Sequence, residues 1–162
     1  MNPSPILYVE DNEDDVLLLR FAFKRADILN PLHFARDGQE AIDYLAGAEK
    51  FSDRAKYPIP SLVLLDLKLP KKMGMEVLQW IRQESGMRKL PVIILSASGQ
   101  KSDLERCYGL GANAFLVKPS DAESLADMCR ALKHFWLTYN VPPPECIEAP
   151  KPIPEPRTSS TR

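Results

Sequence analysis

Short apolar runs of strand length, separated by helical patterns, constrain the fold of this chain most strongly. Four of them are Ile6–Val9, Leu62–Leu65, residues 92–95 and Ala114–Val117. Continuous apolar character predicts strands covered on both faces, as in a parallel sheet flanked by helices. A fifth run, Leu32–Ala35, follows a proline and alternates in polarity, which is typical of an edge strand.

Amphipathic patterns between these runs predict five helices. They are expected over residues 13–26, 39–46, 75–84, from about 102 onward, and 121–137. Asp37 is a candidate N-cap of the second helix. Ser102 with Glu105, and Ser120 with Glu123, have the spacing of capping boxes and predict the last two helix starts. This alternation predicts an α/β fold, a doubly wound parallel sheet with right-handed crossovers.

Composition narrows the class of protein. A chain of 162 residues with 44% hydrophobic residues suits one domain, and a net charge of −1 gives no electrostatic case for DNA or a membrane surface as partner. No apolar run reaches the roughly 18 residues of a membrane span, and the start lacks a basic signal region, so we expect a cytoplasmic protein. The three cysteines are too widely spaced to indicate a disulfide framework or a zinc site.

Two segments depart from the strand–helix rhythm. Residues 48–60 form a long polar connection, which is either a tolerated surface insertion or a functional loop. Residues 141–162 hold seven of the fifteen prolines and predict an extended or disordered tail, with a Pro-rich docking motif as the alternative. We therefore expect one domain over residues 1–140 and a Pro-rich tail over 141–162.

Polar residues follow four of the predicted strands. Glu10 and Asp11 follow the first, Asp66 the third, Ser96 the fourth and Lys118 the fifth. Taken singly, each has a plain structural explanation: a helix dipole for the first two, a strand-end cap, turn chemistry, and a lysine that happens to precede a proline. The carboxyl ends of parallel strands meet at one edge, however, so we expect all five to converge on one site.

The chemistry of this set favours a phosphoryl group. Three adjacent carboxylates repel one another unless cations neutralise them. Lys118 is one cation, and a hard metal such as Mg²⁺, which prefers oxygen ligands, would be another. Ser96 could then donate to a phosphate oxygen, and Asp66, central and already ionised at neutral pH, would be the nucleophile.

The segment LLDLKLP at residues 64–70, with Gly74 further on, carries a family resemblance. The proline four residues and the glycine eight residues after Asp66 match the spacing of the receiver domain of two-component response regulators, which the chain resembles over residues 5–137. The resemblance implies a flavodoxin-like (βα)5 fold with strand order 2-1-3-4-5. It also implies that Asp66 accepts a phosphoryl group from the phosphohistidine of a sensor histidine kinase or a phosphotransfer protein.

The same resemblance implies a Mg²⁺ site. Asp11 and Asp66 would bind the metal directly, Glu10 would act mainly through water, and the backbone carbonyl of Lys68 would complete the protein ligands. Lys118 would pair with the phosphoryl oxygens.

Two residues are implied to switch with phosphorylation. Ser96 would move toward the phosphate, and Phe115, three residues before the lysine, would change rotamer with it. The sequence departs from the commonest family pattern at both, where threonine and tyrosine are more usual, and at Met73, where an acid is frequent. These departures bear on the lifetime of the phosphate and the extent of the switch.

The 48–60 loop and residues 134–137 are similar to small stand-alone regulators that partner phytochromes. This implies a sensor kinase of the phytochrome type, an unknown downstream protein reached by protein–protein contact, and no DNA-binding output. Some such regulators form homodimers through the face of the fourth helix, fifth strand and fifth helix. Phe135 and Trp136 would either serve that contact or pack on the domain's own core.

Two other functions compete with this interpretation. A hydrolase using an aspartyl phosphate usually carries its nucleophile after the first strand, with a second aspartate two residues on, where this chain has Lys68. A phosphorylation-independent adaptor would not need the complete set of Asp11, Asp66, Ser96 and Lys118. We therefore expect a phosphoacceptor switch and not an enzyme, with Mg²⁺-dependent self-phosphorylation and autodephosphorylation as its only chemistry.

Overall fold

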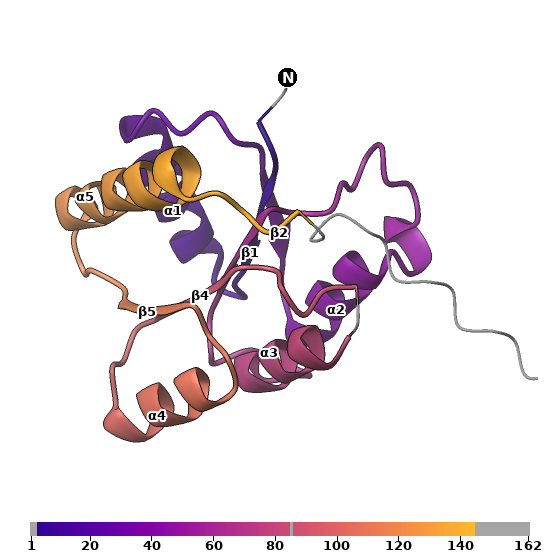
Figure 1. Cartoon of the computed structure of the whole chain (residues 1–162). Helices are drawn as coiled ribbons and strands as arrows, with labels where there is room; N and C mark the ends of the chain where they lie inside the picture. The colour runs from indigo at the N-terminus through magenta and orange to yellow at the C-terminus, as the bar shows by residue number, and fades with distance from the viewer. Residues whose placement is uncertain (1–2, 85, 145–162) are drawn as a thin grey trace, which may run out of the picture.

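Five parallel strands form one sheet in the order β2-β1-β3-β4-β5 (Figure 1). The computed structural model describes residues 3–84 and 86–144. The strands are β1 (Ile6–Val9), β2 (Leu32–Ala35), β3 (Leu62–Leu65), β4 (Val92–Ser96) and β5 (Ala114–Val117). Every neighbouring pair is parallel. The predicted flavodoxin-like fold and its strand order are confirmed.

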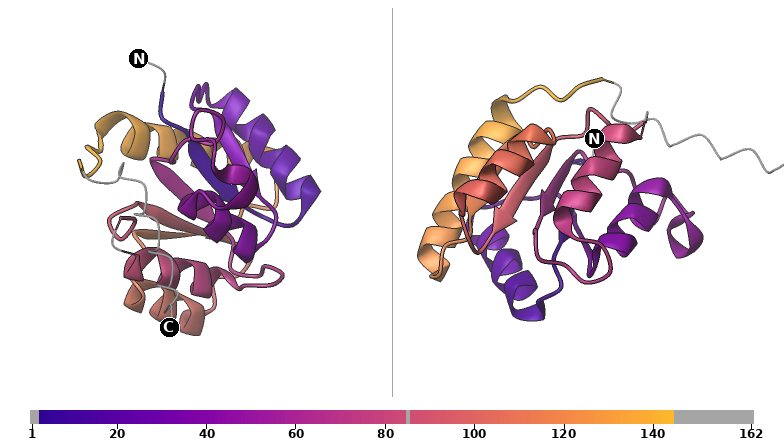
Figure 2. Two further views of the ribbon diagram at one scale, coloured as in Figure 1. Left: turned by 90° about the vertical axis from the view of Figure 1, so that its right-hand side faces the viewer. Right: turned by 90° about the horizontal axis from the view of Figure 1, so that it is seen from below.

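Helices cover both faces of the sheet (Figures 1 and 2). One face carries α1 (Glu13–Arg25) and α5 (Ala122–Leu132), which pack against each other. The other carries α2 (Gly38–Ala46), α3 (Gly74–Gln83) and α4 (Lys101–Gly109). None of the described helices is long and apolar enough to cross a bilayer.

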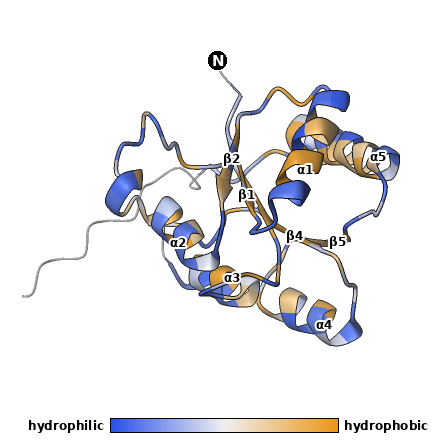
Figure 3. Cartoon of the chain, turned by 180° about the vertical axis from the view of Figure 1, so that it is seen from behind, coloured by the Kyte–Doolittle hydropathy of each residue, from blue (hydrophilic) through white to orange (hydrophobic). Residues whose placement is uncertain are grey.

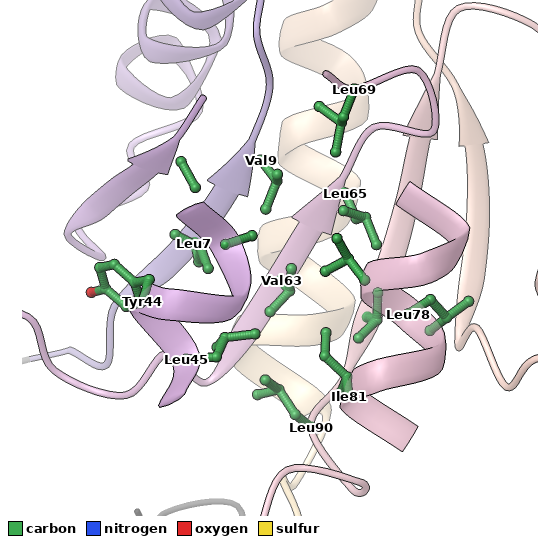
Figure 4. Packing of buried hydrophobic residues seen from close by; sticks show 14 of the residues in the cluster. Leu7, Val9, Tyr44, Leu45, Val63, Leu65, Leu69, Leu78, Ile81 and Leu90 are labelled. Atoms are coloured by element: carbon green, nitrogen blue, oxygen red, sulfur yellow. The ribbon is translucent and has the colours of Figure 1, made fainter. Parts of the chain in front are cut away.

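The three central strands are buried on both sides and divide the core in two. Successive side chains of a strand point to opposite faces, so Leu7 and Val63 join the cluster beneath α2 and α3, and Tyr8 and Leu64 join the cluster beneath α1 and α5. Figure 4 shows the first cluster, in which Leu45 and other helix residues face the strands. The strands are apolar along their length and the helices mixed (Figure 3), as two-sided burial requires.

The two edge strands are less buried. Three of the four residues of β2 are only partly buried, as its alternating sequence predicted. The expectation that Ala114–Val117 is covered on both faces was wrong, because β5 is the opposite edge and Val117 is exposed. An apolar sequence does not reveal which strand lacks an outer neighbour.

Helix starts were predicted with mixed success. The side chain of Asp37 accepts from the amide of Glu40 at 2.8 Å and caps α2 as predicted. Neither predicted capping box starts its helix. Gln100 is the N-cap of α4, and Asp121 caps α5 by accepting from the amide of Ser124 at 2.8 Å. In α5 a carboxylate one residue beyond the serine supplies the acceptor instead.

The last helix changes its winding instead of ending at residue 137. α5 continues as η2 (Lys133–Tyr139), a π-helix in which each turn is wider. Trp136 packs against the core cluster beneath α1 and α5, whereas Phe135 is 57% exposed. The sequence left open whether these two aromatic residues pack on the core or form an intermolecular contact. The structure places Trp136 on the core and leaves Phe135 exposed to solvent. Of the predicted tail, residues 145–162 lie outside the described part of the chain.

The 48–60 connection is fastened to the end of α2. It contains η1 (Glu49–Phe51), and Phe51 and Tyr57 pack against Tyr44 of the helix. The guanidinium of Arg54 donates to the carbonyls of Tyr44 and Leu45, each at 2.7 Å. Those carbonyls belong to the last turn of α2, where they have no partner within the helix. The Tyr44 carbonyl also accepts from the amide of the C-cap residue Gly47 at 3.2 Å, so Arg54 adds side-chain donors to the backbone cap at this helix end.

Candidate functional site

Backbone hydrogen bonds extend the sheet one residue past the strand ends and fix the polar residues there. The amide of Glu10 donates to the last carbonyl of β2 at 3.0 Å, and the amide of Asp66 donates to the last carbonyl of β1 at 3.1 Å. The amide of Lys118 donates to the carbonyl of Ser96 at 2.7 Å. Four predicted site residues therefore leave the same edge of the sheet from adjacent strands.

The ammonium of Lys118 is the centre of an ion-pair network. Its Nζ lies 2.5 Å from Oε2 of Glu10, 3.2 Å from Oδ2 of Asp15 and 3.3 Å from Oδ2 of Asp66. These contacts join four segments of the chain that are up to 108 residues apart in sequence. Burial alone would lower the pKa of Lys118, but the surrounding carboxylates outweigh it and raise the pKa.

Asp66 is a buried acid whose two oxygens have different partners. Its Oδ1 accepts from the amides of Leu67 at 2.7 Å and Lys68 at 3.4 Å. Its Oδ2 faces Lys118. The backbone thus holds one oxygen in place, and the other is left beside the ammonium.

Glu10 is more deeply buried than Asp66. Its Oε1 accepts from the amide of Asn12 at 3.2 Å. Its Oε2 accepts from the hydroxyl of Tyr8, also at 3.2 Å, and from the ammonium of Lys118. Burial raises the pKa of Glu10 to about 7, and the neighbouring Asp66 raises it too, while Lys118 lowers it. Burial and Glu10 likewise raise the pKa of Tyr8.

Three acids at this edge form a cluster typical of a divalent metal site. One carboxylate oxygen each from Glu10, Asp11 and Asp66 lies within 4.8 Å of the others. All three are hard oxygen donors, and Asp11 is exposed, which leaves the cluster open to solvent on one side.

Gly74 allows α3 to start directly against the acceptor loop. Its amide donates to the carbonyl of Leu67 at 2.9 Å. A Cβ at this position would lie 2.1 Å from the carbonyl oxygen of Asp66. The glycine eight residues after Asp66 is therefore required by close approach of the backbone. Gly38 has the same role on the far side of the loop, where a Cβ would lie 2.0 Å from the carbonyl of Lys72.

A family model for the response regulator receiver domain matches residues 6–130, which is most of the chain. The chain belongs to the response regulator receiver family. The family match spans all five strands, and it covers α5 almost to its end.

Curated relatives and solved structures extend this assignment. The receiver is 37% identical to the probable methanogenesis regulatory protein FilR2 of Methanothrix harundinacea over 142 residues, covering 88% of this chain and 89% of FilR2. It is 36% identical to the response regulator Rcp1 of Synechocystis over 135 residues, covering 83% of this chain and 90% of Rcp1.

Two response regulators of known structure are similar to this chain. Phosphorylated RcpA, a cyanobacterial phytochrome response regulator, superposes with a TM-score of 0.80 at 32% identity, covering 87% of this chain and 99% of RcpA. The Mn²⁺-bound form of Rcp1 superposes with a TM-score of 0.78 at 35% identity, with the same coverage. A relative has thus been crystallised with a divalent cation.

The two expected switch residues of the receiver lie on neighbouring strands. Ser96, the last residue of β4, is buried, and its Oγ accepts from the amide of Ser98 at 3.4 Å. Phe115 on β5 is partly buried and packs against the core cluster beneath α2 and α3. β4 and β5 are paired here, with Ile94 opposite Phe115.

Sequence reasoning missed two members of the receiver site. Asp15 was one of three acids at the start of the first helix, and nothing in the sequence distinguished it from Glu13 and Asp14. Tyr8 was taken as one more apolar strand residue, although its hydroxyl reaches Glu10. Its position two residues before Glu10, on the same face of β1, was the available signal.

Proposed function

We propose that this receiver is a single-domain response regulator of a two-component phosphorelay that accepts a phosphoryl group on Asp66 from a histidine kinase. One observation carries the proposal. The buried carboxylate of Asp66 has one oxygen held by backbone amides and the other 3.3 Å from the Lys118 ammonium, and it clusters with two further acids, Glu10 and Asp11. That combination offers both a nucleophile and positive charge for an incoming phosphoryl group.

In the proposed transfer, Oδ2 of Asp66 attacks the phosphorus of a phosphohistidine. The new P–O bond forms as the P–N bond breaks, and the imidazole of the kinase keeps the electron pair. Lys118 follows the negative charge from the carboxylate oxygen to the phosphoryl oxygens. A Mg²⁺ ion held by Asp11, Asp66 and the carbonyl of Lys68, with Glu10 acting mainly through water, would supply further positive charge at the phosphoryl group when bound.

The phosphorylated state is then proposed to bias a two-state switch. Ser96 would donate its hydroxyl to a phosphoryl oxygen, and Phe115 on the neighbouring strand would change rotamer as the serine moves. Among the described residues, the one hydrogen-bond partner of the Ser96 hydroxyl is the amide of Ser98 at the long distance of 3.4 Å, which supports such a movement. The change would alter the face formed by α4, β5 and α5, and that face would contact a downstream protein.

We further propose a phytochrome-type histidine kinase as the partner and the cytoplasm as the location. The phytochrome response regulator RcpA supports the kinase class. RcpA and Rcp1 each match over 87% of this chain and 99% of their own, which supports a receiver over residues 1–140 and a short tail over 141–162. A homodimer through the α4-β5-α5 face is proposed as well. The exposed Phe135, just beyond α5, and the exposed Val117 on β5 are available for it.

The test is phosphorylation with acetyl phosphate as donor. Wild-type protein with Mg²⁺ should acquire a base-labile acyl phosphate, which Asp66→Asn and chelation of the metal should both abolish. Asp127→Asn, the same change at an exposed position on α5, should label like wild type. A stable label on serine would contradict the proposal. Absence of label in wild type would favour an adaptor, and turnover of many unrelated phosphomonoesters would favour a hydrolase.

The kinase class needs its own experiment. Phytochrome-type and other histidine kinases, autophosphorylated with labelled ATP, should be mixed with the receiver for short times. We expect the label to move fastest from the phytochrome-type kinases. Equal or faster transfer from the others would contradict the proposed pairing and leave the proposed acceptor in place.

A further inference from the structure

The Lys118 ammonium has no hydrogen-bond donor to spare. A lysine carries three N–H groups, and those of Lys118 face three different carboxylates, on Glu10, Asp15 and Asp66. If Asp66 is phosphorylated, as in the proposed function on which this inference rests, its Oδ2 becomes the bridging oxygen, and the N–H that faced it can donate to one phosphoryl oxygen. Any second hydrogen bond from Lys118 to the phosphoryl group must then be taken from Glu10 or from Asp15.

We propose that Asp15 is a positioning residue that competes with the phosphoryl group for Lys118. In the unphosphorylated receiver, Asp15 accepts one of the three hydrogen bonds of the ammonium and so draws Lys118 toward α1. In the phosphorylated receiver it gives up that contact. Asp15 thereby sets how many hydrogen bonds Lys118 can give to the phosphoryl group. No hydrogen bond or ion pair among the described residues joins its side chain to Asp66 or to the other acids of the cluster.

Burial identifies Asp15 as the partner that can be released. The side chain of Glu10 is 2% exposed and that of Asp66 is 11% exposed, whereas that of Asp15 is 38% exposed. A buried carboxylate that loses its cation suffers a large desolvation penalty, but a half-exposed one can be hydrated instead. Glu10 also holds Lys118 at the shortest distance, 2.5 Å.

The surroundings of Asp15 leave room for this exchange. Asp15 and Lys118 line the same surface hollow, together with Ala97 and Ser120, so water can reach the carboxylate when the ammonium leaves. Asp15 also lies in the first turn of α1, whose N-cap Asn12 accepts from its amide at 3.1 Å. The side chain can therefore change partner while the helix start remains capped by the backbone.

Asp14 provides a matched control. It is the preceding residue, carries the same charge, is exposed, and donates its amide to the same N-cap. No described ion pair or side-chain hydrogen bond joins its carboxylate to Lys118. Asp14→Asn and Asp15→Asn remove the same charge from the same helix turn, and only the second removes a partner of the ammonium.

The experiment measures binding of beryllofluoride, a mimic of the acyl phosphoryl group, by isothermal titration calorimetry in excess Mg²⁺. We expect Asp15→Asn to bind it about two- to fivefold more tightly than Asp14→Asn, the range expected for a partly exposed ion pair. The acyl phosphate formed from acetyl phosphate should change lifetime in Asp15→Asn and not in Asp14→Asn. Mg²⁺ alone, titrated in the same way, should bind the two variants alike.

A Lys118→Met background tests whether Asp15 acts through Lys118. There, Asp15→Asn and Asp14→Asn should bind beryllofluoride equally, because the residue through which Asp15 acts is gone. Equal binding by the two variants in the wild-type background, or weaker binding by Asp15→Asn, would overturn the inference. This comparison does not need the Lys118→Met protein, so it tests the inference even if that protein does not fold. Failure of wild type to label on Asp66 would overturn the proposed function itself, which is a separate outcome.

Discussion

An alanine at position 74 would force the backbone apart at the acceptor loop. Its Cβ would lie 2.1 Å from the carbonyl oxygen of Asp66 and 2.8 Å from the Cα of Leu67. Ordinary contacts of a Cβ begin near 3.4 Å, so the loop or the start of α3 must move by more than an ångström. Both neighbours are backbone atoms directly after the buried strand β3, where no flexible side chain can yield.

The size of the effect follows from that geometry. Overpacking in a well-packed region costs about 1–3 kcal/mol, and we expect Gly74→Ala to fall at the upper end because the clash is with backbone. For a chain of this length that corresponds to a fall in Tm of roughly 5–10 °C. Because Asp66 itself is displaced, the rate of labelling by acetyl phosphate should fall by more than the folded fraction.

Gly109 supplies the control, since a Cβ there would meet nothing within 4 Å. It is the last residue of α4, and alanine should stabilise a helical position by up to about 1 kcal/mol. Thermal unfolding and labelling would be measured for both variants. The same chemical change should thus have opposite effects at the two positions. A Gly74→Ala protein that melts and labels like Gly109→Ala would refute the steric argument.

Three further predictions concern regions outside the site. Burial lowers the pKa of His33, so as the pH falls the unfolded chain takes up a proton on this histidine before the folded chain does, and stability should fall below about pH 6.5. The urea midpoint should therefore be lower at about pH 5 than at about pH 7.5, and the difference between the two midpoints should shrink in His33→Gln. Arg54→Lys should lower the unfolding free energy by about 1–3 kcal/mol, because an ammonium cannot cap the carbonyls of α2 as the guanidinium does, and unchanged stability would argue against the cap. Trp136→Ala should destabilise the fold by about 2–4 kcal/mol in denaturant titrations. Phe135→Ala should alter stability little and instead weaken any self-association seen by analytical ultracentrifugation. A large loss of stability in Phe135→Ala with little loss in Trp136→Ala would contradict these assignments.

The parts of the fold that could be predicted are those in which local sequence and tertiary environment agree. β1, β3 and β4 are short apolar runs that are buried on both faces, so pattern and burial coincide. The carboxylate of Asp37 acts on an amide three residues away, and its capping role could be predicted because the interaction is local. Where the choice depended on a competing neighbour, as at Asp121, the spacing of serine and glutamate was insufficient.

The site shows the same division. The position of Glu10, Asp66, Ser96 and Lys118 at strand ends was enough to expect them at one edge, and the backbone bonds between strands place them there. Their roles in phosphorylation stay predictions. No sequence pattern indicated which acid of the helix start would reach Lys118, because that depends on the rotation of α1 relative to β5.

Strand length, apolar continuity and residue order are local properties, and they were enough to predict a parallel sheet of alternating strands and helices with three acids, a serine and a lysine at its carboxyl edge. Three features could be found in the folded chain alone: β5 is an exposed edge, Gly74 lies against the Asp66 carbonyl, and Asp15 is a third carboxylate partner of Lys118. These features arise from contacts between segments far apart in the chain, whose geometry is set by packing and not by any single stretch of sequence.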